Sequence, residues 1–255
     1  MQSNVFLTRF VGYNLVKLQK VDSTNNYLKT LLANTTPLAN GTVIMADEQF
    51  AGRGQSNQKW ISQAGKNLTF SIYLQPYFLA AQHQFKLNQA ITLGITDCLI
   101  KLLGNNCNIK WPNDIYFNND KIGGILIENI VRGQKISESV IGIGLNVNQT
   151  IFEGGFKNPN SLANILGVDF DLMNLLGEIL LAIENRYFEL ETGNITLLDT
   201  AFTQRLFKLN QMCQFYNGKQ IFNATIIGVS QTGLLILETN IGQQQFNLKE
   251  VEFVL

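Results

Sequence analysis

Residues 110–128 read KWPNDIYFNNDKIGGILIE and contain the clearest folding signal in the chain. Two short apolar runs, at residues 109–117 and 122–130, flank Asn118-Asn119-Asp120, whose side chains tolerate positive φ and favour a tight turn. We therefore predict a β-hairpin. The adjacent Gly123 and Gly124 in the second strand indicate that a ligand or another backbone segment comes close to it.

The same stretch brings Lys110, Asp114 and Lys121 onto or beside one hairpin. If the first run stays extended, Lys110, Pro112 and Asp114 share one face of the strand. Two cations beside a carboxylate suit a nucleotide with its Mg²⁺. The alternative is a charged hairpin face in water, which is the usual place of Lys and Asp. The Trp-Pro step among these charges and the glycine pair after them favour a functional site.

The periodicity on either side of the hairpin predicts both helices and strands. Helical spacing follows Asp22-Ser23-Thr24, and further helices are expected at 86–103, 171–191 and 197–207, with strands at 42–46, 68–74 and 139–147. From Cys213 onward we expect only short strands, at 214–216, 221–229, 234–238 and 245–255. The sequence thus predicts an α+β domain with a mixed or antiparallel sheet over residues 1–208, and a small C-terminal β-barrel over residues 209–255.

Composition excludes some classes of protein. The chain has 255 residues, a net charge of +0 and no basic excess, which argues against nucleic-acid binding. Cys98, Cys107 and Cys213 form no CxxC pair and are expected to be core residues of a reducing compartment. We find no export signal and no membrane span, so the cytoplasm is the expected location. His83 is expected at the surface, and no cluster of ligands predicts a structural metal site.

A polar, glycine-bearing stretch at residues 50–59 contains Gly52-Arg53-Gly54. Its backbone N–H groups and guanidinium could converge on an anion, although a flexible surface loop that happens to hold an arginine is an equal alternative. The segment is neither a P-loop nor a GxGxxG motif. Asn146 and Asn148 interrupt an apolar strand, and each needs a partner from a ligand or from elsewhere in the fold.

Four blocks in order resemble the biotin protein ligase family over about residues 19–255. They are Ser23-Thr24-Asn25, Gln49 with the AGRG segment through Trp60, the KWPND and K.GGIL block, and GIGLNVN at residues 142–148. The resemblance implies a class II synthetase-like catalytic domain. It also implies that biotin and ATP react to biotinyl-5'-AMP and pyrophosphate, and that biotin is then transferred to one lysine of a biotin carboxyl carrier domain.

The resemblance also implies roles for particular residues. Lys121 would neutralise charge between the biotin carboxylate and the α-phosphate, Arg53 would meet one of these anions, and Asp114 would help to place the Mg²⁺ of ATP and to deprotonate the acceptor lysine. Gly123 and Gly124 would floor the biotin pocket, and Trp60 would cover the adenylate. The expected biotin-binding residues are Ser23, Thr24, Asn25, Gln49, Arg53, Gly54, Gln55, Lys121, Gly123 and Gly124. The expected nucleotide-binding residues are Arg53, Trp60, Lys110, Asn113, Asp114, Lys121 and Asn146.

The chain departs from the family pattern at two places, the glycine-rich loop and the terminal barrel. The glycine-rich loop of the family often reads GRGRxGxxW, whereas Gln55 and Asn57 replace the second arginine and the third glycine here. Since Gln55 brings no charge, we expect a working enzyme with a leakier adenylate intermediate. Lys249 falls near the position where many relatives have an arginine in the terminal barrel.

Several alternatives stay open at this point. Longer family members begin with a DNA-reading winged helix, and because the first block here starts at Ser23 we expect no DNA binding. Family members can form homodimers through sheet edges, and this sequence does not decide the oligomeric state. A lipoate–protein ligase shares the fold and the adenylate chemistry, but its arginine-bearing block is not evident. A non-catalytic biotin or nucleotide binder is the alternative from another class.

Overall fold

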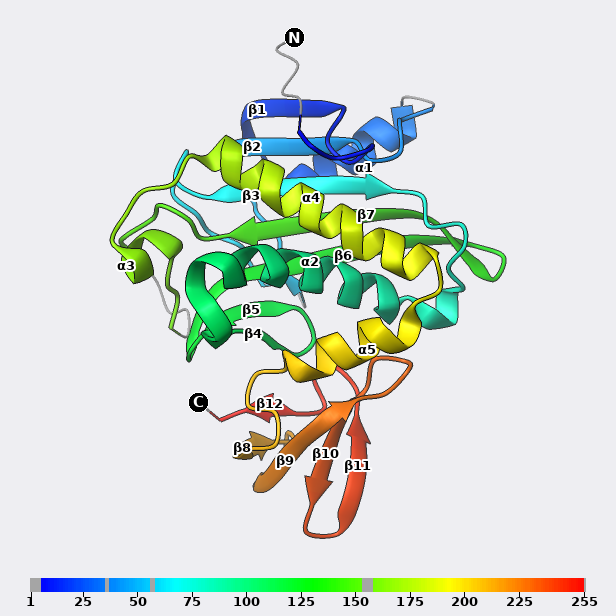
Figure 1. Cartoon of the computed structure of the whole chain (residues 1–255), viewed down its shortest axis with the longest axis vertical. Coiled ribbons are helices and arrows are strands. Elements are labelled where there is room, and N and C mark those ends of the chain that lie inside the picture. The colour runs from blue at the N-terminus through cyan, green and yellow to red at the C-terminus, as the bar shows by residue number, and fades with distance from the viewer. Residues whose placement is uncertain (1–5, 35–36, 56–57, 153–157, 255) are drawn as a thin grey trace.

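The computed structural model describes residues 6–34, 37–55, 58–152 and 158–254. Its larger part is built on a seven-stranded sheet in the order β1-β2-β3-β7-β6-β5-β4 (Figure 1). The strands are β1 Leu15–Val21, β2 Val43–Gln49, β3 Leu68–Leu74, β4 Cys107–Lys110, β5 Asp114–Phe117, β6 Asp120–Arg132 and β7 Lys135–Leu145. Only β1 and β2 pair in parallel among these described strands. The predicted mixed sheet is therefore confirmed.

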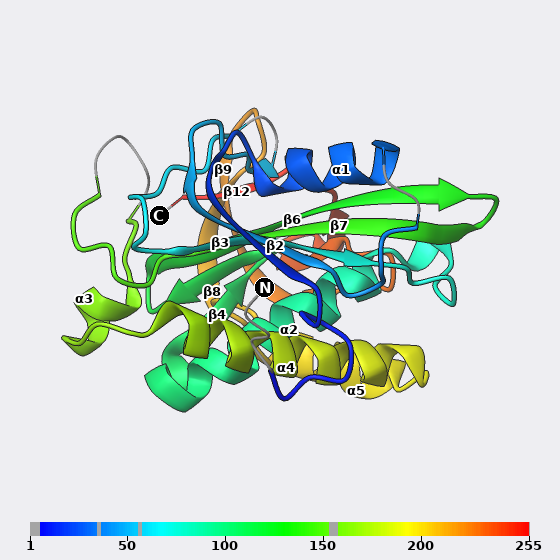
Figure 2. The same ribbon diagram turned by 90° about the horizontal axis from the view of Figure 1, so that it is seen from above.

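The helices divide unequally between the two faces of this sheet (Figure 2). They are α1 Thr24–Asn34, α2 Phe85–Leu103, the short α3 Leu162–Leu166, α4 Leu172–Glu191 and α5 Ile195–Gln204. Helices α2 and α4 cover one face over the main core, and Gly94 lets them approach because a Cβ there would lie 2.7 Å from the backbone nitrogen of Ile183.

Helix α1 lies on the opposite face over a small cluster that contains Leu28, Ile44 and Val140. It covers only part of that face.

The predicted hairpin forms, but the run before it does not stay extended. Strand β5 turns directly into β6, with Phe117 opposite Asp120. Upstream, the chain reverses at residues 111–113, where the Trp111-Pro112 bond is cis, and Lys110 pairs with Asp114 across antiparallel strands. Tertiary contacts hold this turn, since the Trp111 indole donates to the Gly233 carbonyl at 2.9 Å. The prediction of one strand at residues 109–117 with a shared face was wrong for this reason.

A second sheet follows, in the order β11-β10-β9-β8-β12. Its strands are β8 Met212–Tyr216, β9 Ile221–Val229, β10 Leu235–Thr239, β11 Gly242–Phe246 and β12 Glu252–Phe253. Strands β11 and β12 stand at opposite ends of this row, so the described residues do not confirm the expected closed barrel. The predicted strand at residues 245–255 is broken by a turn in which the Asn247 N–H donates to Glu250 at 2.7 Å. Lys249 is exposed on that turn.

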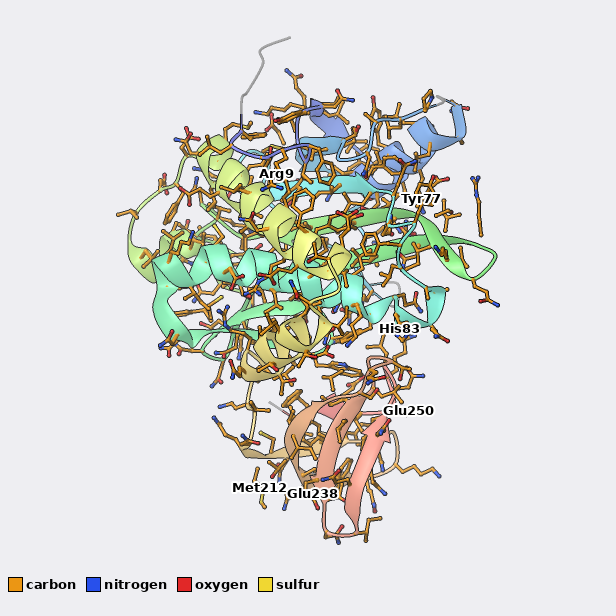
Figure 3. All side chains as sticks on the ribbon, turned by 45° about the vertical axis from the view of Figure 1, so that its right-hand side comes forward. Arg9, Tyr77, His83, Met212, Glu238 and Glu250 are labelled. Carbon is orange, nitrogen blue, oxygen red and sulfur yellow. The ribbon has the colours of Figure 1, made fainter. Side chains whose placement is uncertain are left out.

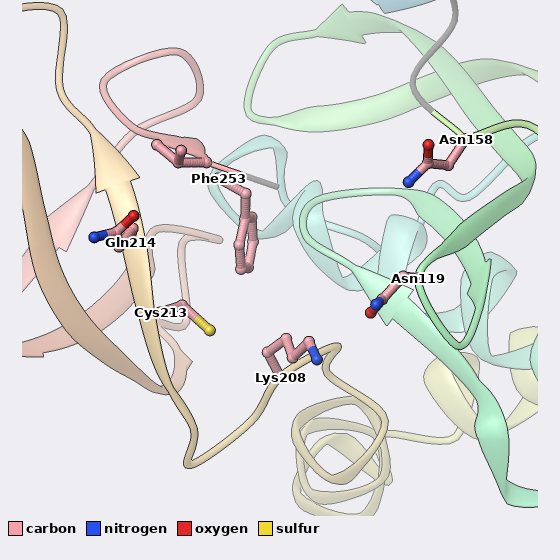
Figure 4. Close-up of a pocket in the computed structure, with 7 residues that line it drawn as sticks. Asn119, Asn158, Lys208, Cys213, Gln214 and Phe253 are labelled. Carbon is pink, nitrogen blue, oxygen red and sulfur yellow. The ribbon is translucent and has the colours of Figure 1, made fainter.

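The two sheets share no strand, but aromatic side chains join them. Phe207 contacts Tyr116 on one side and Phe253 on the other, with ring centroids 5.2 Å and 5.6 Å apart. A division into residues 1–208 and 209–255 stays our proposal. Between the sheets lies a pocket of about 260 Å³, shown in Figure 4, whose lining residues are Asn119, Asn158, Lys208, Cys213, Gln214, Phe253 and Val254.

The remaining expectations concern isolated residues. All three cysteines are free, and burial raises the pKa of Cys98 and of Cys107 to about 12, which keeps both thiols protonated and unreactive. His83 lies half-exposed at the margin of the larger part (Figure 3). Among the residues described, no helix is long and apolar enough to traverse a membrane.

Candidate functional site

Three glycines leave a patch of bare backbone on the face that α1 only partly covers. Gly124 of β6 pairs with Gly144 of β7, and Gly142 lies two residues before it. Side chains from other segments occupy the space above them, since a Cβ on Gly142 would meet Asn25 and one on Gly124 would meet Asp114. We refer to Gly124, Gly142 and Gly144 as the glycine floor.

Gly123 does not contribute a bare position to the glycine floor. A Cβ on this residue would lie 3.2 Å from Leu145 Cδ1 and 3.6 Å from Ile115 Cβ, on the core side of the sheet. Sequence reasoning chose Gly123 and Gly124 because they are adjacent, and it missed Gly142 and Gly144. Their two-residue spacing in GIGLNVN was the available signal, because alternate residues of a strand share a face.

Lys121 and Asp114 form an ion pair at the edge of the glycine floor. Lys121 Nζ lies 2.6 Å from Asp114 Oδ1, and the side chains are 30% and 28% exposed. The hairpin positions both side chains. Asp114 pairs with Gly124 and Lys121 pairs with Tyr116, and the β5–β6 ladder has a bulge between Ile115 and Tyr116. The site thus joins a solvent-accessible cation and a carboxylate to bare backbone.

A polar chain borders the opposite side of the glycine floor. Gln49 Oε1 accepts from the Thr24 N–H at 2.7 Å, the Thr24 and Ser71 hydroxyl oxygens lie 2.7 Å apart, and Ser71 Oγ donates to Asn25 Oδ1 at 2.6 Å. Ser23 precedes them and is buried. The structure therefore brings together the Ser-Thr-Asn block and Gln49, to which the family resemblance gives a role in biotin binding. That role remains a prediction. Ser71 was missed, because Thr24 and Asn25 become its neighbours only when α1 packs over β3.

Arg53 points to a carboxylate that the sequence analysis did not select. Its Nη2 lies 3.0 Å from Glu128 Oε1 and its Nη1 lies 3.2 Å from Glu128 Oε2, while Nη1 also donates to Asn26 at 2.9 Å. Glu128 accepts in addition from Asn25 Nδ2 at 2.9 Å and Lys29 Nζ at 2.8 Å. Burial would raise the pKa of Glu128, but the hydrogen bonds from Lys29, Asn25 and Arg53 lower it below its ordinary value.

The Trp60 indole packs on the glycine floor at Gly144. A Cβ on Gly144 would lie 2.6 Å from Cζ2 and 2.8 Å from Cδ2 of the indole. The Trp60 Nε1–H is buried, and no acceptor for it exists among the described residues. Gly52 holds the base of this loop, since its carbonyl accepts from the Trp60 N–H at 2.9 Å. A buried donor without a partner is costly, so this position favours a ligand that brings an acceptor.

The first departure from the family pattern, at Gln55 and Asn57, lies in this loop. The Gln55 carbonyl accepts from the Gln58 N–H at 3.0 Å. Gly54 comes directly before Gln55, and its N–H donates to the Gln58 carbonyl at 2.7 Å. Asn57 lies outside the described residues, so its predicted effect on the adenylate remains a prediction.

Three expected nucleotide-binding residues make contacts within the protein. Asn113 donates to the carbonyl of Ile125, and Asn146 donates to the carbonyl of Asn160 at 3.0 Å. Lys110 lies over the Tyr116 ring at 4.9 Å and over the Phe253 ring at 5.3 Å. These contacts give the two asparagines and the lysine a bracing role in the fold, and their binding to ATP remains a prediction.

Replacing Gly144 by Ala is expected to displace the Trp60 indole, because the added methyl group would overlap the ring. The chain has two tryptophans, so a Trp111→Phe background leaves Trp60 as the only one. In that background, the fluorescence emission maximum of Trp60 should shift to the red. The affinity for biotin, the ligand that the family resemblance implies, should fall about tenfold or more. Unchanged emission in Gly144→Ala would contradict the placement of the indole over this glycine.

Comparison with known proteins is consistent with this site. Residues 17–146 match the model of the biotin/lipoate A/B protein ligase family. The chain is 30% identical over 250 residues to the bifunctional ligase/repressor BirA of Bacillus subtilis, covering 96% of this chain and 75% of that protein. It is 29% identical to the biotin–[acetyl-CoA-carboxylase] ligase of Paracoccus denitrificans over 92% of this chain and 99% of that one.

The fold agrees with the same group of proteins. The structure of biotin protein ligase from Aquifex aeolicus in complex with biotin and ATP superposes with a TM-score of 0.79 at 26% identity, covering 94% of this chain and 98% of the other. The family match spans both the Ser-Thr-Asn block and the Lys121–Asp114 hairpin that the structure brings together. The chain belongs to the biotin/lipoate A/B protein ligase family.

Proposed function

We propose that this chain is an ATP-dependent biotin ligase that makes biotinyl-5'-AMP and transfers biotin to one lysine of a biotin carboxyl carrier domain. The observation that carries the proposal is the Lys121–Asp114 pair at the edge of the glycine floor, with the Thr24, Asn25 and Gln49 chain on its other side. The relatives named as biotin ligases support biotin as the acid that is activated.

Biotin fits the composition of this site. Its ureido group has both donors and acceptors, and the polar chain at the start of α1 offers hydroxyl, amide N–H and amide oxygen groups. The glycine floor would let the fused rings of biotin come close to the sheet, beside the Trp60 indole that already covers Gly144. The carboxylate end of biotin then lies toward Lys121.

The first step is attack of the biotin carboxylate oxygen on the α-phosphorus of ATP. A bond forms between that oxygen and phosphorus, the bond to the β-phosphate bridging oxygen breaks, and pyrophosphate leaves with the electron pair. Lys121 stabilises the negative charge on the α-phosphoryl oxygens.

ATP is expected to bind as its Mg²⁺ complex, because phosphoryl transfer generally uses a metal ion to neutralise the phosphate charge. Asp114 would supply one carboxylate to this Mg²⁺, and the phosphates would supply other oxygens, as is usual for Mg²⁺.

In the second step, the acceptor lysine amine attacks the acyl carbon of biotinyl-5'-AMP. The amide bond forms, the acyl–oxygen bond to AMP breaks, and AMP leaves. The amine must lose a proton to react, and Asp114 is the carboxylate beside Lys121 that could accept it.

We propose the cytoplasm as the compartment, since the three cysteines are free.

The proposed transfer is tested with a purified carrier domain of a biotin-dependent carboxylase, ATP, Mg²⁺ and labelled biotin. Label should enter the carrier domain, and a carrier variant in which the acceptor lysine is Arg should take none. Label that enters the intact carrier and the Arg variant equally would refute enzyme-directed transfer to one lysine. Incorporation of lipoate in place of biotin would favour the lipoate ligase alternative.

A further inference from the structure

We propose that Glu128 is a positioning residue of the biotin-activation step, and that Arg53 acts through it as a brace and not as a catalytic cation. The inference rests on the proposed function and concerns the same site. Together the pair would fasten the loop that carries Trp60 to helix α1 and strand β6.

The first observation is that Glu128 joins three segments. Both of its oxygens accept from the Arg53 guanidinium of the loop, at 3.0 and 3.2 Å. The same carboxylate accepts from Asn25 and Lys29, which lie on α1. A two-pronged arrangement of this kind fixes the orientation of a guanidinium as well as its position.

The second observation is that the Arg53 guanidinium donates its terminal N–H groups to Glu128 and Asn26. Its Nη1 donates to both residues and its Nη2 to Glu128, so the face that would grip a carboxylate or phosphate is engaged within the protein. Asp114 Oδ1, in turn, is paired with Lys121. The two cations therefore have different partners. Arg53 pairs with Glu128 and holds the loop, whereas Lys121 pairs with Asp114 where the reaction would take place.

The third observation connects Glu128 to the biotin pocket. Asn25 donates its amide to Glu128 and accepts from Ser71, and Ser71 adjoins Thr24 and Gln49. This chain fixes which end of the Asn25 amide is donor and which is acceptor. Loosening Glu128 would release the loop and the first turn of α1 together, and both border the site that biotin would occupy.

The experiment measures biotin-dependent ATP–pyrophosphate exchange for Arg53→Gln, Glu128→Gln and the double variant. Glutamine at position 128 keeps an acceptor for Asn25 while it removes the charge. Each single variant should raise KM for biotin about tenfold and leave kcat within about threefold, and the double variant should be no worse than either single one. Glu138→Gln is the control, because Glu138 pairs with the exposed Arg132 on the far part of the β6–β7 hairpin.

Other results would overturn the proposal. If Arg53→Gln lowered kcat by more than about a hundredfold while Glu128→Gln left it unchanged, Arg53 would be acting at the reacting phosphate. Additive effects in the double variant would show that Arg53 and Glu128 act independently. Kinetics equal to the parent's in both single variants would show that neither residue positions the site.

A parent chain without exchange activity would refute the proposed function while leaving the brace testable. In the Trp111→Phe background, either single variant should shift Trp60 emission. No shift would overturn the brace.

Discussion

Lys121→Met is expected to lower biotin-dependent ATP–pyrophosphate exchange about a thousandfold. Lys121 is the cation paired with Asp114 at 2.6 Å beside the glycine floor, where negative charge would build up on the α-phosphate. Methionine keeps most of the length of the side chain and removes its charge. Biotin affinity should change by less than about threefold, because Gln49, Thr24 and Asn25 form the other side of the site.

Two variants make the Lys121 result specific. Lys17→Met removes an exposed lysine that pairs with Asp47 at 3.1 Å, and it should leave the exchange rate unchanged. Lys121→Arg keeps the charge and should retain more activity than Lys121→Met. An exchange rate in Lys121→Met within about tenfold of the parent would exclude a central role for this cation in activation.

Glu184→Ala is expected to lower the free energy of unfolding by about 3–5 kcal/mol. Glu184 is 1% exposed, and its carboxylate accepts from three successive backbone N–H groups, those of Arg9, Phe10 and Val11, at 2.7 to 3.0 Å. Alanine would leave these donors without their acceptor where the segment before β1 crosses α4. Urea unfolding followed by circular dichroism measures the change.

Glu191→Ala is the matched control, because it removes an exposed carboxylate from the last turn of the same helix. Its effect should stay within about 0.5 kcal/mol. Equal unfolding free energies for Glu184→Ala and the parent would show that this carboxylate does not hold the N-terminal segment.

Local patterns in the sequence predicted most of the fold. Helices α2 and α4 follow from apolar residues at helical spacing, and the β5–β6 hairpin follows from Asn118 and its neighbours, where φ at Asn118 is +51°. Strand β1 was missed because it lies at the sheet edge, pairs in parallel with β2 without a turn between them, and carries exposed Lys17 and Lys20. The reversal at Trp111 was missed because it depends on Gly233, which is far away in the sequence.

The site was predictable to the extent that each block is local. Ser23 to Asn25, Gln49 and the Lys121–Asp114 hairpin were all selected, and the structure brings each group into place. Ser71 and Glu128 were not, since neither stands out among its neighbours and each meets its site partners only when α1 and the Arg53 loop pack against the sheet. The same holds for Arg53, whose partner could be inferred only once β6 lay beside α1.

The central claim is that this chain activates biotin, and biotin-dependent ATP–pyrophosphate exchange without any acceptor protein tests it most directly. Purified chain, ATP, Mg²⁺ and labelled pyrophosphate are incubated with biotin, with lipoate or with neither acid. We expect label to enter ATP only when biotin is present. Exchange with lipoate alone would contradict the assignment of the substrate, and no exchange with either acid would contradict the enzymatic account and favour a binding role.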